Sequence, residues 1–151
     1  MIIRESLERD HDQEHGKLVE ARISMSRGEF DKNSFLEFVN NIRRHIYIEE
    51  EIIFPDLVVL DSNLKGPVSG LEMEHASLWM LMDRILAETD SGTVRKSPKY
   101  LEEIERILAV HNAVESTNIY PKIKDERIPD LEQATLPEGW ICRRLRKNRR
   151  Q

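Results

Sequence analysis

The chain has 151 residues and a formal net charge of −5; charged residues make up 34% of it and hydrophobic residues 39%. This length suits one domain, and six glycines and six prolines are too few for a loop-rich β protein. The sequence has no run of 18 apolar residues for a membrane span, no apolar signal segment near its N-terminus, and one cysteine, which excludes an internal disulfide. We therefore expect a cytoplasmic helical protein with no membrane partner.

Two segments in the N-terminal half show apolar residues at steps of three and four, the spacing of a helix that buries one face. The first runs from about residue 5 to 26 and ends at Arg27-Gly28. The second begins at residues 31–34, where Asp31 or Ser34 can cap a helix. Pro55 is expected to end it.

Two more amphipathic segments follow. A linker over residues 61–67 leads into a third helix that runs to about Thr89, and Ser97-Pro98 opens a fourth, which Pro121 limits. Four long amphipathic helices with short connections predict an all-α, up-down-up-down four-helix bundle over residues 1–127.

The C-terminal residues 128–151 are predicted to form an irregular extension with a short helix and no separate domain. Residues 143–151 hold six basic residues and no acid, which leaves a net charge of −11 on residues 1–142. An acidic body repels nucleic acid, so only the basic segment could attract it. Alternatively, Trp140 and Ile141 could anchor the segment on the bundle or on another subunit of a homo-oligomer.

Histidines lie where the helical pattern calls for apolar side chains. His45, His75 and His111 each occupy such a position, and Glu49 and Glu115 occupy the next one after His45 and His111. A buried carboxylate without a partner is costly, and a metal cation is a strong compensating charge. This placement predicts a metal site in the bundle core.

An H-x-x-x-E motif occurs twice. His45 and Glu49 precede Phe54-Pro55, and His111 and Glu115 precede Tyr120-Pro121 by the same interval. A spacing of four puts both side chains on one face of a helix. A lone motif of this kind is usually a solvated pair, but the second and fourth helices run parallel, so the two motifs would meet at one level of the bundle.

The first helix offers two further histidines. Position around the helix favours His11, whereas level along the bundle favours His15, so we retain both. Imidazole and carboxylate donors suit iron, zinc or manganese, and seven donors exceed what one tetrahedral zinc needs, so two metal ions bridged by the glutamates fit better. The candidate ligands are His11, His15, His45, Glu49, His75, His111 and Glu115.

These motifs resemble the hemerythrin-like, or HHE cation-binding, family. The resemblance covers about residues 5–125 and lies in ERDH or DQEHGKL, HIYIEEEIIFP, MEHASLWML and HNAVESTNIYP. It implies a non-haem di-iron centre with an oxo or hydroxo bridge. Some members of the family bind oxygen reversibly, and others respond to iron, oxygen or nitric oxide. The expected function is binding or sensing of O2, NO or peroxide.

The sequence departs from the oxygen carriers of this family at two positions. They have a second histidine four residues after the one in the third helix, where this chain has Trp79, and an aspartate bridge where this chain has Glu115 at a different spacing. Simple oxygen transport is therefore not the expected role. The alternatives are a di-iron enzyme of peroxidase or oxidase type and an iron-handling protein.

A ferritin-like di-iron carboxylate protein is the structural alternative. Its E-x-x-H signature occurs at Glu8–His11 and Glu72–His75. Both glutamates lie off the buried stripe of their helices, so a histidine-rich site is preferred.

Overall fold

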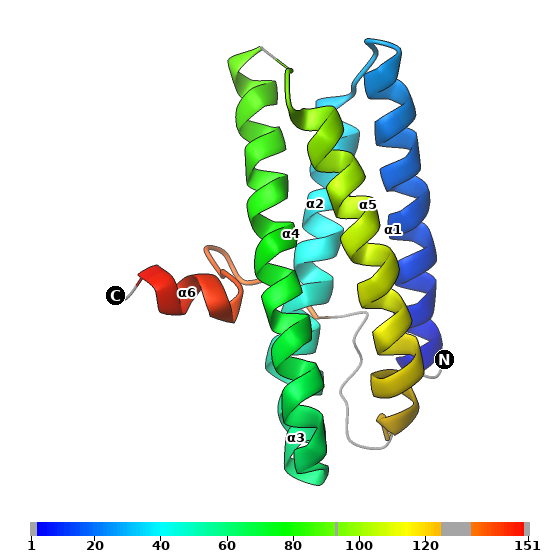
Figure 1. Cartoon of the computed structure of the whole chain (residues 1–151), viewed down its shortest axis with the longest axis vertical. Coiled ribbons are helices and arrows are strands. Elements are labelled where there is room, and N and C mark those ends of the chain that lie inside the picture. Colours follow the sequence, from blue (N-terminus) through cyan, green and yellow to red (C-terminus); the bar gives the residue numbers. More distant parts are fainter. Residues whose placement is uncertain (1–2, 93, 125–133, 150–151) are drawn as a thin grey trace.

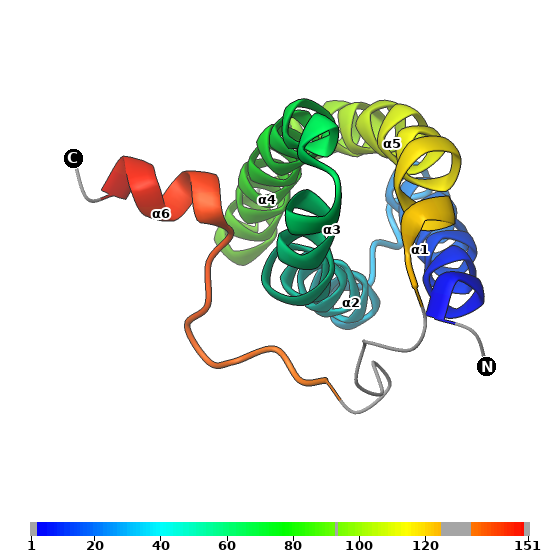
Figure 2. The same ribbon diagram turned by 90° about the horizontal axis from the view of Figure 1, so that it is seen from below.

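Four long helices pack side by side (Figure 1) in this computed structural model, which describes residues 3–92, 94–124 and 134–149. They are α1 (Ile3–Ser26), α2 (Lys32–Ile48), α4 (Lys65–Ser91) and α5 (Ser97–Val114). Contacts join α1 to α2, α2 to α4, α4 to α5 and α5 back to α1, so the four helices close into a ring (Figure 2). The prediction of an all-α bundle is confirmed.

Local sequence sets the ends of these helices. Asp31 caps α2, because its side chain accepts the backbone N–H of Asn33 at 3.0 Å. Gly92 ends α4 with φ +77, a conformation that glycine adopts without steric cost. The Glu88 carboxylate accepts backbone N–H groups of Lys96 and Ser97 at 2.9 and 2.8 Å, which fixes the turn into α5.

The prediction that Pro55 ends the second helix is wrong. The chain stays helical through a wide π turn, η1 (Glu49–Ile53), and continues as α3 (Phe54–Leu60). Proline lacks an N–H and its ring clashes with the carbonyl four residues earlier, so the turn widens instead of breaking. The N–H of Phe54 accordingly donates to the carbonyl of Glu49, five residues back.

The same widening occurs in the other half of the chain. After α5 comes the π turn η3 (Glu115–Ile119), in which the N–H of Tyr120 donates to the carbonyl of Glu115, and then the 3₁₀ turn η4 (Tyr120–Lys122). Both π turns begin at the glutamate of the H-x-x-x-E repeat.

The third helix starts earlier than the sequence suggested. Asp61 caps the 3₁₀ turn η2 (Ser62–Leu64), and α4 begins directly after it at Lys65. Gly66 and Pro67 were expected in a linker but lie in the first turn of α4. Proline is tolerated there, because backbone N–H groups in the first turn have no partner within the helix.

Two hydrophobic clusters fill the bundle. One includes Phe38, Met82 and Ile104 and lies toward the end where α4 meets α5; the other includes Leu7 and Leu71 and lies toward α3. Along α1, α4 and α5 the buried histidines fall between residues of the first cluster and residues of the second. A polar layer therefore crosses the middle of an otherwise apolar core.

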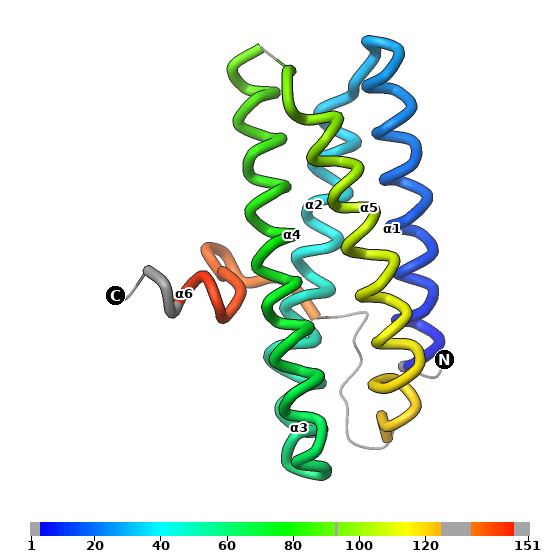
Figure 3. Tube along the Cα trace, in the orientation of Figure 1, coloured from blue at the N-terminus to red at the C-terminus, as the bar shows by residue number. Residues whose placement is uncertain are grey.

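The C-terminal segment is described again from Ala134 and ends in a short helix, α6 (Arg143–Arg149), which contacts α4 on the outside of the ring (Figure 3). The predicted boundary between residues 127 and 128 lies outside the described residues. Within the described part of the chain, no helix has the length and apolar character needed to cross a membrane.

Candidate metal centre

Six buried side chains gather in the polar layer, none of them more than 6% exposed. We call them the His/Glu cluster: His11 from α1, His45 from α2, Glu49 from η1, His75 from α4, His111 from α5 and Glu115 from η3. The seventh candidate, His15, does not join them. It is exposed on α1, one turn beyond His11, so position around the helix decides between the two.

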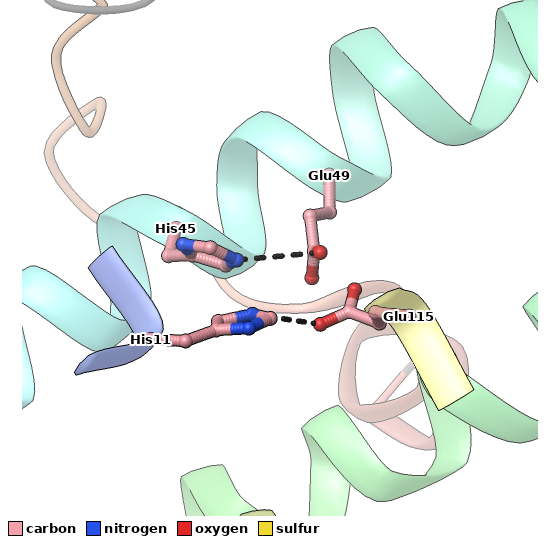
Figure 4. Close-up of side chains that lie close together, drawn as sticks. All are labelled: His11, His45, Glu49 and Glu115. Atoms are coloured by element: carbon pink, nitrogen blue, oxygen red, sulfur yellow. Dashed lines mark hydrogen bonds and ion pairs between the residues drawn. The ribbon is translucent and has the colours of Figure 1, made fainter. Parts of the chain in front are cut away.

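The His/Glu cluster divides into two groups that share both carboxylates. His11, His45, Glu49 and Glu115 form the first group (Figure 4), and Glu49, His75, His111 and Glu115 form the second. Within each group the potential ligand atoms all lie within 4.8 Å of one another. This arrangement can hold two cations, with the carboxylates between them.

Every imidazole presents its Nε2 atom to a shared carboxylate. Nε2 of His11 and Nε2 of His111 each lie 3.2 Å from Glu115 Oε1. Nε2 of His45 lies 3.3 Å from Glu49 Oε2, and Nε2 of His75 lies 3.0 Å from Glu49 Oε1. The four rings therefore point the same nitrogen toward the centre.

A tyrosine that the sequence reasoning did not assign to the site lies within the first group. The Tyr120 hydroxyl is 2.9 Å from Glu49 Oε2, 3.2 Å from Glu115 Oε1 and 2.9 Å from His11 Nε2. Burial and the charges of both glutamates raise its pKa well above the usual value, so the phenol stays protonated and donates. In the sequence, Tyr120 could have been noticed because it precedes Pro121 in the repeat. The equivalent residue in the first motif, Phe54, has no hydroxyl, so the repeat alone did not indicate a polar role.

A second ring of carboxylates, also missed from the sequence, contacts the outer nitrogens. Nδ1 of His75 lies 2.8 Å from Glu50 Oε2, and Nδ1 of His111 lies 3.1 Å from Glu74 Oε1. Nδ1 of His45 lies 3.5 Å from an oxygen of Asp10. Such outer contacts orient ligand imidazoles and increase their basicity.

The charges within the centre shift several pKa values. Burial opposes protonation of His45 and His111, but the nearby glutamates outweigh it and hold both pKa values well above the usual range. The pKa of His75 is also raised, because its hydrogen bonds to Glu49 and Glu50 outweigh burial. Burial favours protonation of Glu49, yet the positive charge of His45 and hydrogen bonds hold its pKa well below the usual range. The carboxylates thus attract positive charge, which a metal ion can supply in place of protons.

One buried atom fits a cation directly. Oε2 of Glu115 is fully buried and has no hydrogen-bond partner among the described residues. Leaving a buried carboxylate oxygen unpaired is costly, and coordination to a cation removes that cost. The nitrogen and oxygen donors suit iron, zinc or manganese.

The ferritin-like alternative places its glutamates elsewhere. Glu8 accepts the hydroxyl of Ser116 at 2.9 Å, Glu72 lies 3.5 Å from Arg143, and neither belongs to the two ligand groups. Trp79 is buried under the guanidinium of Arg43, 4.1 Å from the ring centre. Helix α4 accordingly contributes one imidazole to the cluster.

The family model for the hemerythrin HHE cation-binding domain matches residues 3–123. The chain belongs to the hemerythrin HHE cation-binding family. The match spans all four long helices and both ligand groups, so the HHE domain and the His/Glu cluster coincide. Searches of curated proteins and of solved structures returned no match.

Proposed function

We propose that this HHE domain is an up-down-up-down four-helix bundle of the hemerythrin type that holds two non-haem iron ions. It would bind or sense a small ligand there: O2, NO or peroxide. The observation that carries the proposal is the sharing of Glu49 and Glu115 by two separate histidine pairs. A single-metal site would need only one of those pairs.

The residues of the His/Glu cluster would supply ligands to two separate ions. His11 and His45 would hold one ion, and His75 and His111 the other, with the two glutamates spanning both. Four donors for each ion leave coordination positions for an external ligand. Reversible binding of O2 or NO is the chemistry that a ferrous pair supplies. Zinc or manganese can take the same donors as substitutes.

A surface cavity offers a route to the first group. It has a volume of about 300 Å³, lies between α1 and α5, and is lined by His11, Asn112 and Ser116 among others. This space is ample for a diatomic molecule. Because His11 lines the cavity and also faces Glu115, a ligand entering there reaches the His/Glu cluster from the α1 side.

The surroundings restrain further chemistry. Leu7, Phe54 and Ile119 are each at most 1% exposed and keep bulk water out of the end of the bundle beside the cluster. The Tyr120 hydroxyl, protonated at neutral pH, holds Glu49 in place by donating a hydrogen bond to it. Excluding bulk water at this end limits hydrolysis and proton leakage at the site, which supports binding of a ligand without further reaction.

Tyr120 also supports a second candidate function, a di-iron enzyme that turns over peroxide. Its buried phenol is a proton donor within hydrogen-bond distance of both bridging glutamates. Sustained consumption of hydrogen peroxide by the iron-loaded protein, lost in Tyr120→Phe, would select this alternative.

The binding function is tested by adding O2 or NO to the anaerobic, ferrous-loaded protein and recording its optical spectrum. We expect a new charge-transfer band in the visible with at least one gas. Glu20→Gln is the matched control and should give the same band, because Glu20 is exposed on α1 and lies outside both the His/Glu cluster and the cavity between α1 and α5. No optical change with either gas, in protein shown to contain iron, overturns ligand binding and leaves a closed structural site.

A further inference from the structure

The segment from Trp140 to Arg146 docks on the bundle close to the second ligand group. Cys142 is 0% exposed, and the Trp140 ring packs 5.2 Å from Tyr47 and 5.8 Å from Trp79. Figure 2 shows α6 outside the ring of four helices, with its first turn nearest to α4. This docking is specific, because it buries the Cys142 side chain and packs the Trp140 ring edge-to-face against two aromatic rings.

Glu50 connects the docked segment to the His/Glu cluster. It follows Glu49 directly in the π turn and is 0% exposed. Oε2 of Glu50 lies 2.8 Å from His75 Nδ1, and Oε1 accepts the backbone N–H of Arg143 at 2.8 Å. A buried carboxylate is stable only when its oxygens are paired, and these two contacts pair both of them.

We propose that the Trp140–Arg146 segment is a positioning element for the metal centre. The N–H of Arg143 fixes the Glu50 carboxylate, Glu50 fixes the ring of His75, and His75 Nε2 thereby faces Glu49. The inference rests on the proposed function, since His75 would hold an ion. Outer-sphere contacts of this kind typically change metal affinity by about 10–100-fold.

Charge complementarity holds the segment in register around Glu50. Both Arg146 and the Trp140 indole donate to Glu51 Oε1, at 3.1 and 3.2 Å. Arg143 lies 3.5 Å from Glu72 on α4. The basic residues of α6 therefore pair with two carboxylates close to Glu50, those of Glu51 and Glu72.

Coupling between two binding events is reciprocal. If docking orients His75, a metal ion on His75 must in turn favour docking. Metal at the centre should therefore protect the C-terminal segment, about 30 residues along the chain from the last proposed ligand, Glu115.

Two substitutions at Arg143 in the full chain distinguish the role of its backbone N–H from the role of its side chain. Arg143→Pro deletes the N–H at the first position of α6, where proline is tolerated, whereas Arg143→Ala keeps the N–H and loses only the guanidinium. We expect Arg143→Pro to release one of two irons to a ferrous chelator about 10–100-fold faster than wild type, with Arg143→Ala within a few-fold of wild type.

A second pair of variants keeps the test valid if the proline variant misfolds. Glu50→Ala should release iron as fast as Arg143→Pro, while Glu138→Ala, which changes an exposed glutamate two residues before the segment, should behave as wild type. A separate readout is tryptic cleavage after Arg143, Arg144 or Arg146. Iron should slow it about tenfold in wild type and leave it unchanged in Glu50→Ala.

The outcomes are distinguishable. If Arg143→Pro and Glu50→Ala release iron at the rates of their controls, or if iron does not protect the segment from trypsin in wild type, the positioning role is wrong and iron binding still stands. A wild-type protein that takes up no iron overturns the proposed function, and this inference with it.

Discussion

Glu49 and Glu115 are the two residues through which all four buried imidazoles connect. Each lies at the start of a π turn, is fully buried, and faces an imidazole four residues earlier in the chain. Because each belongs to both ligand groups, loss of either should affect both metal positions, whereas loss of one histidine should affect only one.

Replacing His11 tests this division. His11→Ala removes a donor from the first group only, so we expect the iron content to fall from about two ions per chain toward one. Metal analysis after anaerobic loading measures it, and His15→Ala, one turn away and exposed, is the control. Equal iron in both variants would show that His11 holds no ion.

Glu14 makes the stability of the metal-free protein depend on pH. Burial, opposed by His45 and reinforced by Asp10, raises its pKa from 4.5 to about 8. The pKa of Glu14 is higher in the folded than in the unfolded protein. The free energy of unfolding is therefore highest below pH 4.5 and falls as the pH rises toward 8. At pH 7 this loss amounts to at most about 3 kcal/mol.

Glu14→Gln removes this titration. Relative to wild type, the metal-free variant should gain free energy of unfolding steadily between pH 5 and 8, as measured by urea denaturation. Glu20→Gln, an exposed glutamate on the same helix, should show no such trend. A pH-independent difference between Glu14→Gln and wild type would contradict the assigned burial cost.

At the scale of elements, the repeat produces the same local structure twice. Each H-x-x-x-E motif is followed by an aromatic residue and a proline, and each gives a π turn that begins at the glutamate. Proline cannot donate a backbone N–H, and the residue before each proline, Phe54 or Tyr120, donates instead to the glutamate carbonyl five residues earlier, so the helix continues in a wider turn. The two π turns thus place equivalent glutamates from the two halves of the chain in one layer.

Pro55→Ala should relax the first of these turns. An alanine N–H can donate to the carbonyl of Glu51, which favours a regular α-helix and rotates Glu49 relative to α3. We expect iron release to a chelator several-fold faster than in wild type, with a change in the metal-free free energy of unfolding of about 1 kcal/mol or less.

Pro98→Ala is the matched control, because Pro98 also occupies the first turn of a helix but follows no π turn. Iron release at the same rate in the two alanine variants would mean that the π turn does not position the ligand.

The periodic pattern of each helix explains what the sequence could predict. Apolar residues at steps of three and four define the buried face, and a histidine or glutamate on that face is recognisable without a structure. Position around the helix, which favoured His11, agrees with the structure, where His11 is buried in the His/Glu cluster and His15 is exposed. Counting levels from the loops favoured His15, because loop residues add no fixed rise along the bundle.

Contacts between distant segments account for what was missed. Tyr120 reaches His11 across more than a hundred residues, and Glu50 reaches Arg143 across more than ninety. No local pattern marks such partners. Pro55 was misjudged because a proline in a helix has two outcomes, a break or a widened turn, and packing of α3 on the bundle decides between them.

For the whole molecule, a buried polar layer should couple metal binding to folding. A ligand that binds only the folded state stabilises it by mass action, by about 4 kcal/mol at a thousandfold excess over Kd. We expect the melting temperature to rise with iron in wild type and to rise much less in Glu115→Ala. An equal rise in both would place the bound iron outside the His/Glu cluster.

The central claim is a two-metal centre bridged by the shared glutamates, and metal content per chain tests it most directly. Protein purified after iron-supplemented expression is analysed by elemental mass spectrometry, beside Glu49→Ala prepared in the same way. The structure leads us to expect close to two irons per wild-type chain and loss of the pair in the variant. One tightly bound zinc without iron, or an unchanged metal content in Glu49→Ala, would contradict it.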